Sequence, residues 1–234
     1  MQGKNILIVG ASSGVGLATA ELLGAQGVNL YTISRTEPKL PSSLDYKHIN
    51  HDVLGNDFPD DFLPETIDAL IYCPGSINLK PFRSLTPDAF REDYEINVIG
   101  AVKTIKAALK PMKKAEGSPS VVLFSTVAVQ QGMAFHGSVA AAKGAVEGLT
   151  RSLAAELSPK IRVNCIAPSL VNTPLASKIL SSEDRIKASH ERHPLKRFGE
   201  PNDIAQTAAF LVSDNASWIT GQIIGVDGGL SSLR

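Results

Sequence analysis

Short apolar segments alternate with longer segments of helical pattern, and this alternation limits the fold more than any other feature of the chain. Most apolar segments are hydrophobic throughout, which is typical of strands in a parallel sheet covered by helices on both faces. We therefore expect a doubly wound α/β sheet of about seven parallel strands with right-handed crossovers. The expected strands are 5–10, 28–34, 46–50, 68–73, 120–126, 161–167 and 222–228, and the clearest expected helices are 16–27, 86–112 and 139–158.

The length and composition fit one domain. A chain of 234 residues that is 43% hydrophobic can bury a single large core. Residues 169–203 form the one long segment without a strand pattern, and they are polar and interrupted by prolines. Because long segments of this kind inside a compact domain usually serve a function, we expect residues 174–198 to be a lid.

Charge and cysteine usage exclude several classes of function. The formal net charge is zero, so nothing indicates binding to nucleic acid or to an anionic membrane. The first apolar segment is too short for a signal peptide or a membrane span. Cys73 and Cys165 are isolated among apolar neighbours, as buried thiols of a reducing cytoplasm are. His190 and His193 lack a third ligand, so we expect no metal site.

A glycine-rich segment, VGASSGVG at 9–16, joins the first expected strand to the first expected helix. Gly10, Gly14 and Gly16 have no Cβ, so the backbone can turn tightly and approach a pyrophosphate whose charge meets free helix N–H groups. The alternative is an ordinary glycine-rich turn. The strand–turn–helix context favours a nucleotide site.

Further motifs follow in a fixed order along nearly the whole chain. With the glycine-rich segment, they make the chain resemble the short-chain dehydrogenase/reductase family, which implies a Rossmann-type fold in one domain, 1–234. Residues 1–115 would mainly bind the dinucleotide, and residues 116–234 would carry the catalytic face, the lid and a C-terminal oligomerisation strand. The motifs are HDV (51–53), NVIG (97–100), KGAVEGLTRSLAAEL (143–157), RVNCIAP (162–168), NTP (172–174), RFGEPNDIA (197–205) and SWITGQIIGVDGG (217–229).

The resemblance also implies which residues bind a nicotinamide cofactor. The glycine-rich loop would hold the pyrophosphate, the end of the third strand the adenine, and the segment after the sixth strand the nicotinamide. The residues implied are Gly10, Ser12, Ser13, Gly14, Val15, Gly16, Ser34, Arg35, Asp52, Val53, Pro74, Gly75, Lys143, Pro168, Val171 and Thr173.

The end of the second strand favours NADP(H) over NAD(H). A carboxylate at this point binds the ribose 2′-hydroxyl of NAD, whereas an arginine accommodates the 2′-phosphate of NADP. Ser34 stands at the carboxylate position and Arg35 follows it. Arg35 can make a charge-assisted contact with the phosphate, although a solvated surface arginine is the alternative.

One catalytic residue of the resembled family is missing. That family reduces or forms a carbonyl with a serine, a tyrosine and a lysine, helped by an asparagine. The matching residues are Asn97, Lys143 and, at the serine position, Thr126, which keeps a hydroxyl. The tyrosine position, one helical turn before Lys143, is Val139, which has no proton to donate.

No other tyrosine fills the gap. Tyr31 and Tyr46 lie in expected strands on the adenosine side. Tyr72 has the wrong register relative to Lys143 and is expected at most to cover the ribose. Tyr94 is expected to pack in the core.

His136, three residues before Val139, is the candidate substitute acid, because an ordinary histidine titrates near neutral pH. The alternative is a loop histidine that faces solvent. We expect the neighbouring Ser138 to be a helix cap.

Three hypotheses follow from the gap. The chain is an NADP(H)-dependent oxidoreductase for a small carbonyl or alcohol with an impaired or unusual proton donor, or it is a non-catalytic NADP(H) sensor or assembly partner. In the third hypothesis, Val139 is a strain-specific or engineered substitution in an ordinary reductase.

The alanine-rich helices 86–112 and 139–158 pair across a two-fold axis in the resembled family, and they therefore predict a homodimer or homotetramer. The alternative is that these alanines face the chain's own sheet.

Overall fold

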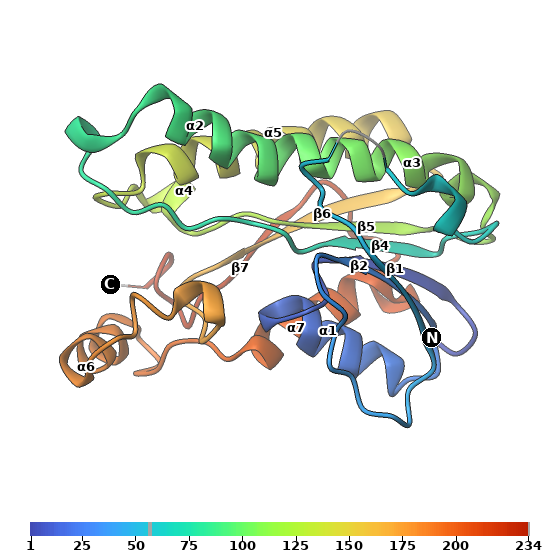
Figure 1. Cartoon of the computed structure of the whole chain (residues 1–234), viewed down its shortest axis with the longest axis horizontal. Coiled ribbons are helices and arrows are strands. Elements are labelled where there is room, and N and C mark those ends of the chain that lie inside the picture. Colours follow the sequence, from blue (N-terminus) through green and yellow to red (C-terminus); the bar gives the residue numbers. More distant parts are fainter. Residues whose placement is uncertain (56–57, 234) are drawn as a thin grey trace.

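Seven parallel strands form one sheet in the computed structural model, which describes residues 1–55 and 58–233 (Figure 1). The strand order is β3-β2-β1-β4-β5-β6-β7, so the sheet grows outward in both directions from the β1–β4 pair. Every neighbouring pair is parallel. The predicted fold and strand number are confirmed. The strands are β1 Asn5–Val9, β2 Asn29–Ser34, β3 Tyr46–Asn50, β4 Ala69–Tyr72, β5 Ser120–Phe124, β6 Arg162–Pro168 and β7 Ile223–Val226.

Helices cover both faces of the sheet. Figure 1 shows α2, α3 and α5 on one face and α1 and α7 on the other, with α6 set apart beside the C-terminus. The described part of the chain contains no helix that is long and apolar enough to cross a membrane. The helices are α1 Gly14–Gly24, α2 Pro87–Tyr94, α3 Gly100–Lys114, α4 Ala128–Gln131, α5 Gly137–Leu157, α6 Glu183–Arg192 and α7 Pro201–Val212.

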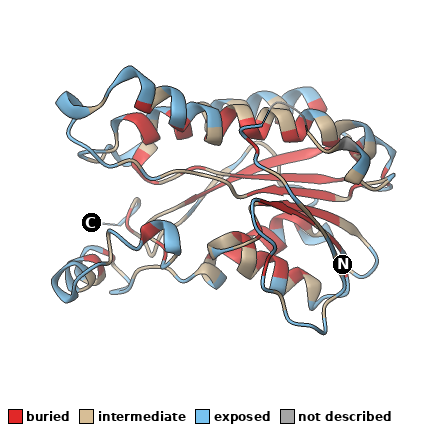
Figure 2. Cartoon of the chain, viewed as in Figure 1, coloured by how far each residue is buried: buried red, intermediate tan, exposed pale blue. Residues whose placement is uncertain are grey.

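The sheet separates two hydrophobic cores. Successive side chains of a strand point to opposite faces, and β1 is buried on both. Leu7 packs in the core under α3 and α5, whereas Ile6 and Ile8 pack in the core toward α1 and α7. Figure 2 shows the inner strands buried between the layers while the outer faces of the helices stay exposed. This double burial explains why the strands are apolar throughout.

The predicted helix 86–112 is wrong in detail. Thr86 caps its start as expected, by accepting a hydrogen bond from Ala89 N, but a π-helical segment, Glu95–Ile99, separates α2 from α3. Side chains bind two carbonyls here: Asn97 Nδ2 donates to Asp93 O, and Tyr72 Oη donates to Ile96 O. These bonds compensate for the changed helical pattern, and such π-turns are frequent at functional sites.

The expected lid contains a helix of its own. Ser182 caps α6 by accepting a hydrogen bond from Arg185 N. An isolated β-bridge between Val171 and Gly199 closes the base of this segment. The chain therefore leaves the main body and returns to it at nearly the same place. The first part of this segment is a 3-10 turn at Pro174–Ala176.

Candidate active site

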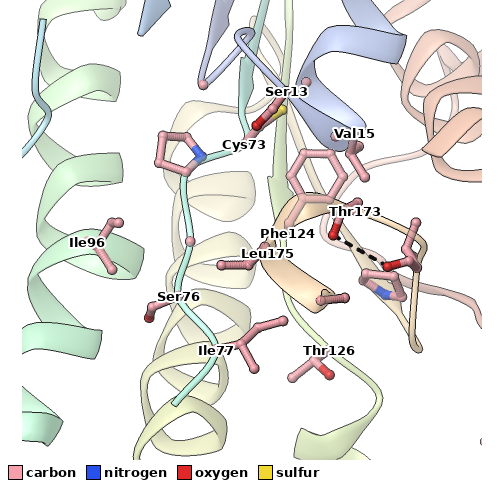
Figure 3. A pocket seen from close by; sticks show the side chains of 18 of the residues that line it. Ser13, Val15, Cys73, Ser76, Ile77, Ile96, Phe124, Thr126, Thr173 and Leu175 are labelled. Atoms are coloured by element: carbon pink, nitrogen blue, oxygen red, sulfur yellow. Dashed lines mark hydrogen bonds between the residues drawn. The ribbon is translucent and has the colours of Figure 1, made fainter. Parts of the chain in front are cut away.

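A cleft of about 510 Å³ runs along the carboxyl ends of the strands. It passes between β1 and β4, where the strand order reverses, which is where ligands bind in open α/β sheets. Figure 3 shows Ser13 and Val15 of the glycine-rich loop toward one end and Ile77 and Thr126 toward the other. The volume is in the range of small-molecule sites.

The glycine-rich loop forms a cradle that side chains would fill. A Cβ on Gly10 would lie 3.0 Å from Pro74, and one on Gly16 would lie 2.1 Å from the carbonyl oxygen of Gly10. Gly14 has a positive φ, and the α1 N-cap residue Ser13 makes no side-chain cap hydrogen bond. The first N–H groups of α1 are therefore available to an anion, and the loop fits a pyrophosphate.

All residues implied for cofactor binding line this cleft. The full set is Gly10, Ser12, Ser13, Gly14, Val15, Gly16, Ser34, Arg35, Asp52, Val53, Pro74, Gly75, Lys143, Pro168, Val171 and Thr173.

At the adenosine end, Ser34 and Arg35 differ in environment. The buried Ser34 hydroxyl donates to Thr36 O at 2.9 Å, so its polar atom is already bound within the loop. Arg35 is exposed, and its guanidinium makes no ion pair within residues 1–55 and 58–233. The arginine can therefore accept a phosphate without breaking an existing ion pair.

At the chemical end, Thr126, Val139 and Lys143 line the same cleft. Lys143 is buried, and its Nζ donates to Phe124 O at 2.8 Å. Burial lowers the pKa of Lys143 to about 8, while the nearby groups Cys165, Cys73 and Asp93 raise it. The lysine therefore titrates close to neutral pH.

The model of a family described as enoyl-(acyl carrier protein) reductase matches residues 10–231. A tropinone reductase homologue from Arabidopsis thaliana is 35% identical over 247 residues, covering 99% of this chain and 94% of that protein. The chain belongs to the short-chain dehydrogenase/reductase family.

Solved structures agree with this membership. The aldohexose dehydrogenase of Thermoplasma acidophilum has a TM-score of 0.89 at 29% identity, over 100% of this chain and 96% of that one. A variant of ElxO with NADPH bound has a TM-score of 0.90 at 26% identity, over 99% of this chain and 100% of that one.

Asn97 lies behind the wall of the cleft rather than in it. Its Nδ2 donates to Ser76 Oγ at 3.0 Å and to Asp93 O at 2.7 Å. Its Oδ1 is buried and has no hydrogen-bond partner among the described residues. In this short-chain dehydrogenase/reductase, Asn97 can act on the cleft only through its neighbours.

Three expectations about hydroxyl-bearing residues near the site are wrong. Tyr72 does not face the cleft: its side chain is buried and donates to Ile96 O at 2.6 Å, and burial raises its pKa above the ordinary range. Tyr94 is 44% exposed rather than packed in the core. Ser138 is not a cap, because α5 begins at Gly137 and the buried Ser138 hydroxyl has no partner in the described part of the chain.

His136 is half-buried at the rim of the cleft, as the residue that precedes α5. Its Nδ1 lies 2.7 Å from Ala134 O, and because a carbonyl can only accept, Nδ1 carries the proton of the neutral ring. His136 thus shares the cleft with Val139 but is bound to its own loop.

Sequence reasoning missed a buried pair at the base of the expected lid, residues 174–198. His193 is 1% exposed, its Nδ1 donates to Ser189 O at 2.6 Å, and its Nε2 is hydrogen-bonded to Ser169 Oγ at 2.7 Å. The serine lines the cleft. The one signal in the sequence was that Ser169 follows Pro168 where the family has glycine.

His190 lies apart from the Ser169–His193 pair and packs against Phe198. The described residues contain no cluster suited to a metal ion.

Proposed function

We propose that the chain is an NADP(H)-dependent oxidoreductase that interconverts a small carbonyl compound and its alcohol, with turnover limited by the missing tyrosine. One observation carries this proposal: a single cleft joins the glycine cradle and Arg35 to Thr126 and Lys143. A nicotinamide cofactor in that cleft would extend from the arginine toward the lysine.

Each residue has a physical task in this proposal. The nicotinamide cofactor supplies or accepts the hydride. The free N–H groups of α1 bind the pyrophosphate, Arg35 binds the 2′-phosphate, and Lys143 binds the nicotinamide ribose. The Thr126 hydroxyl orients the substrate oxygen. Val139 offers no proton, and loss of a general acid reduces the rate by a factor of about 10²–10⁴, or roughly 3–5 kcal/mol.

The lining of the chemical end supports a substrate with an apolar flank. The side chains that surround Thr126 and Val139 in the cleft come from the segment after β4, the turn before α5 and the lid. They are Ile77, Leu79, Met133, Leu175 and Ile179. Apolar walls with a few polar groups are typical of small-molecule sites, so cyclic or alkyl ketones are favoured over sugars.

Parallel measurement of NADPH binding and NADPH consumption tests the proposal. We expect micromolar NADPH binding, weaker NADH binding, and slow oxidation of NADPH with an apolar ketone but not with a sugar of similar size. Tight NADPH binding with no consumption across a carbonyl panel would instead support the alternative, a non-catalytic NADP(H)-binding sensor. Equal affinity for NADPH and NADH would refute the assignment of Arg35.

The surface supports assembly into a homodimer or homotetramer. Ala101, Ala108 and Ala142 are buried in the chain's own core, but Ala141 and Ala155 are exposed on the outer face of α5, where another helix can approach closely. Cys73 and Cys165 are free thiols, which supports a reducing, cytoplasmic compartment.

A further inference from the structure

A buried carboxyl group lies directly behind the chemical end of the cleft. Asp93, on α2, is 2% exposed; one carboxyl oxygen accepts a hydrogen bond from Ser76 Oγ, and the other is buried without a partner among the described residues. A buried carboxylate is unfavourable unless a positive charge or several donors compensate it. Asp93 makes no ion pair in the described part of the chain.

Hydrogen bonds lead from Asp93 toward the lysine as far as Asn97. Ser76 Oγ donates to Asp93 and accepts from Asn97 Nδ2 at 3.0 Å. Figure 3 shows Ser76 on the segment after β4, with its hydroxyl turned toward the side of the cleft that carries Ile96. Asn97 Oδ1 and Lys143 Nζ both border the space beside Gly75: a Cβ built there would lie 3.2 Å from the first and 3.4 Å from the second. A glycine at this position keeps the space between them open.

The other groups that face Lys143 cannot balance its charge at neutral pH. Burial raises the pKa of Cys73 and of Cys165 to about 12, so both thiols are neutral. Glu147, one turn farther along α5, accepts from Ser125 Oγ and pairs with Arg151. Phe124 contributes only a carbonyl oxygen. Asp93 is therefore the acidic group near Lys143 that has no cation of its own.

We propose that Lys143 itself donates the proton in this site and that Asp93, through Ser76 and Asn97, is the positioning residue that holds the lysine in its charged form. This inference rests on the proposed function. As the substrate carbon accepts a hydride, the electron pair of the C=O bond moves to oxygen, and that oxygen takes a proton from Nζ. The neutral amine then regains a proton from water that enters through the cleft.

The geometry favours Lys143 over His136 as the donor. Lys143 is buried and bound to Phe124 O at the end of β5, directly before the segment that carries Thr126. His136 is tied to Ala134 in the loop before α5 and donates through Nδ1 to that carbonyl. An ammonium has three N–H donors, so after the bond to Phe124 O two are left, one for the nicotinamide ribose and one for a substrate.

The test follows the charge of Lys143 directly in the ligand-free protein. Carbon-13 NMR of labelled lysine gives the titration midpoint of Lys143, with the resonance assigned by its loss in Lys143→Arg. We expect a midpoint near the pKa of about 8 in the parent. Asp93→Asn, which keeps the shape and the acceptor for Ser76, should lower the midpoint by about 0.5 pH unit or more. Ser76→Ala should lower it in the same direction.

Glu92→Gln is the matched control, because it removes a carboxylate from the neighbouring, exposed position of α2. The control should leave the midpoint unchanged. Equal midpoints in Asp93→Asn and Glu92→Gln would overturn the role of Asp93. Circular dichroism checks the fold, and Ser76→Ala decides the question if Asp93→Asn does not fold.

Kinetics tests the donor role separately. The NADPH affinity of Asp93→Asn at pH 6, where the lysine is charged in both proteins, should equal that of the parent. Ketone reduction by the parent should decline as pH rises through the Lys143 midpoint, and in Asp93→Asn this decline should begin at lower pH. A decline that does not move, or a parent without turnover, refutes Lys143 as the donor. Failure to bind NADPH at all would instead refute the proposed function, while the NMR titration would still decide the role of Asp93.

Discussion

Replacement of Val139 by tyrosine tests whether the missing phenol limits turnover. Val139 lies one helical turn before Lys143 on α5, and both line the cleft. A tyrosine would share the face of the lysine and place its hydroxyl toward Thr126. Although Val139 is 5% exposed, it borders a cleft of about 510 Å³ into which the ring can extend. The packing cost should therefore fall at the low end of about 1–3 kcal/mol for a larger core residue.

The expected gain is at least about 100-fold in ketone reduction, the lower limit of what a general acid contributes. It is best measured as kcat for NADPH oxidation with an apolar ketone, together with NADPH affinity and Tm. Val139→Phe is the matched control, because it adds the ring without the proton. Equal turnover by the tyrosine and phenylalanine variants, with normal NADPH binding in both, would show that a proton donor at this position does not limit the reaction.

Three further predictions concern other parts of the chain. Arg35→Ala should reduce NADPH affinity by about tenfold or more and leave NADH affinity unchanged, since a charge-assisted contact contributes about 1.5–3 kcal/mol; Lys39→Ala, an exposed cation outside the cleft, should change neither. His136→Ala should keep most of the parent's ketone reductase activity if Lys143 is the donor, and loss of that activity would assign the proton to His136. Light scattering should give a dimer or tetramer at micromolar concentration, which a 24.8 kDa particle would contradict; Trp218, the single tryptophan and 99% exposed in the isolated chain, should shift its emission to the red on dilution if it lies in the interface.

The fold could be predicted because the inner strands, such as β1, β4 and β5, are buried on both faces. Burial of this kind requires apolar side chains at consecutive positions, as in Ile6, Leu7 and Ile8, and the sequence displays that requirement directly. The cofactor residues lie at strand ends, and parallel strands bring their carboxyl ends to one edge. The order of the motifs was therefore enough to predict that these residues share a cleft.

Contacts between distant segments could not be predicted in the same way. The π-helical segment depends on Tyr72 and Asn97 binding carbonyls of their neighbours, and helical periodicity contains no record of such bonds. Tyr72 was misplaced because side chains alternate along a strand, so an error of one residue in register exchanges core and cleft. The bond between Ser169 and His193 joins residues 24 positions apart, and only the path of the chain between them brings them together.

Cofactor binding and proton donation place different requirements on the charge state of Lys143. A lysine that only binds a ribose needs a hydrogen-bond donor, and a neutral amine provides one as an ammonium does. Burial lowers the pKa of Lys143 from its ordinary value to about 8 and so makes the neutral amine more accessible, which a binding protein could tolerate. A proton donor must instead start charged. Asp93 opposes the effect of burial, although its second carboxyl oxygen is left without a partner in the described residues, an arrangement that is unfavourable by itself. This opposition is useful for proton transfer and unnecessary for binding, and it therefore favours an active oxidoreductase over a non-catalytic sensor.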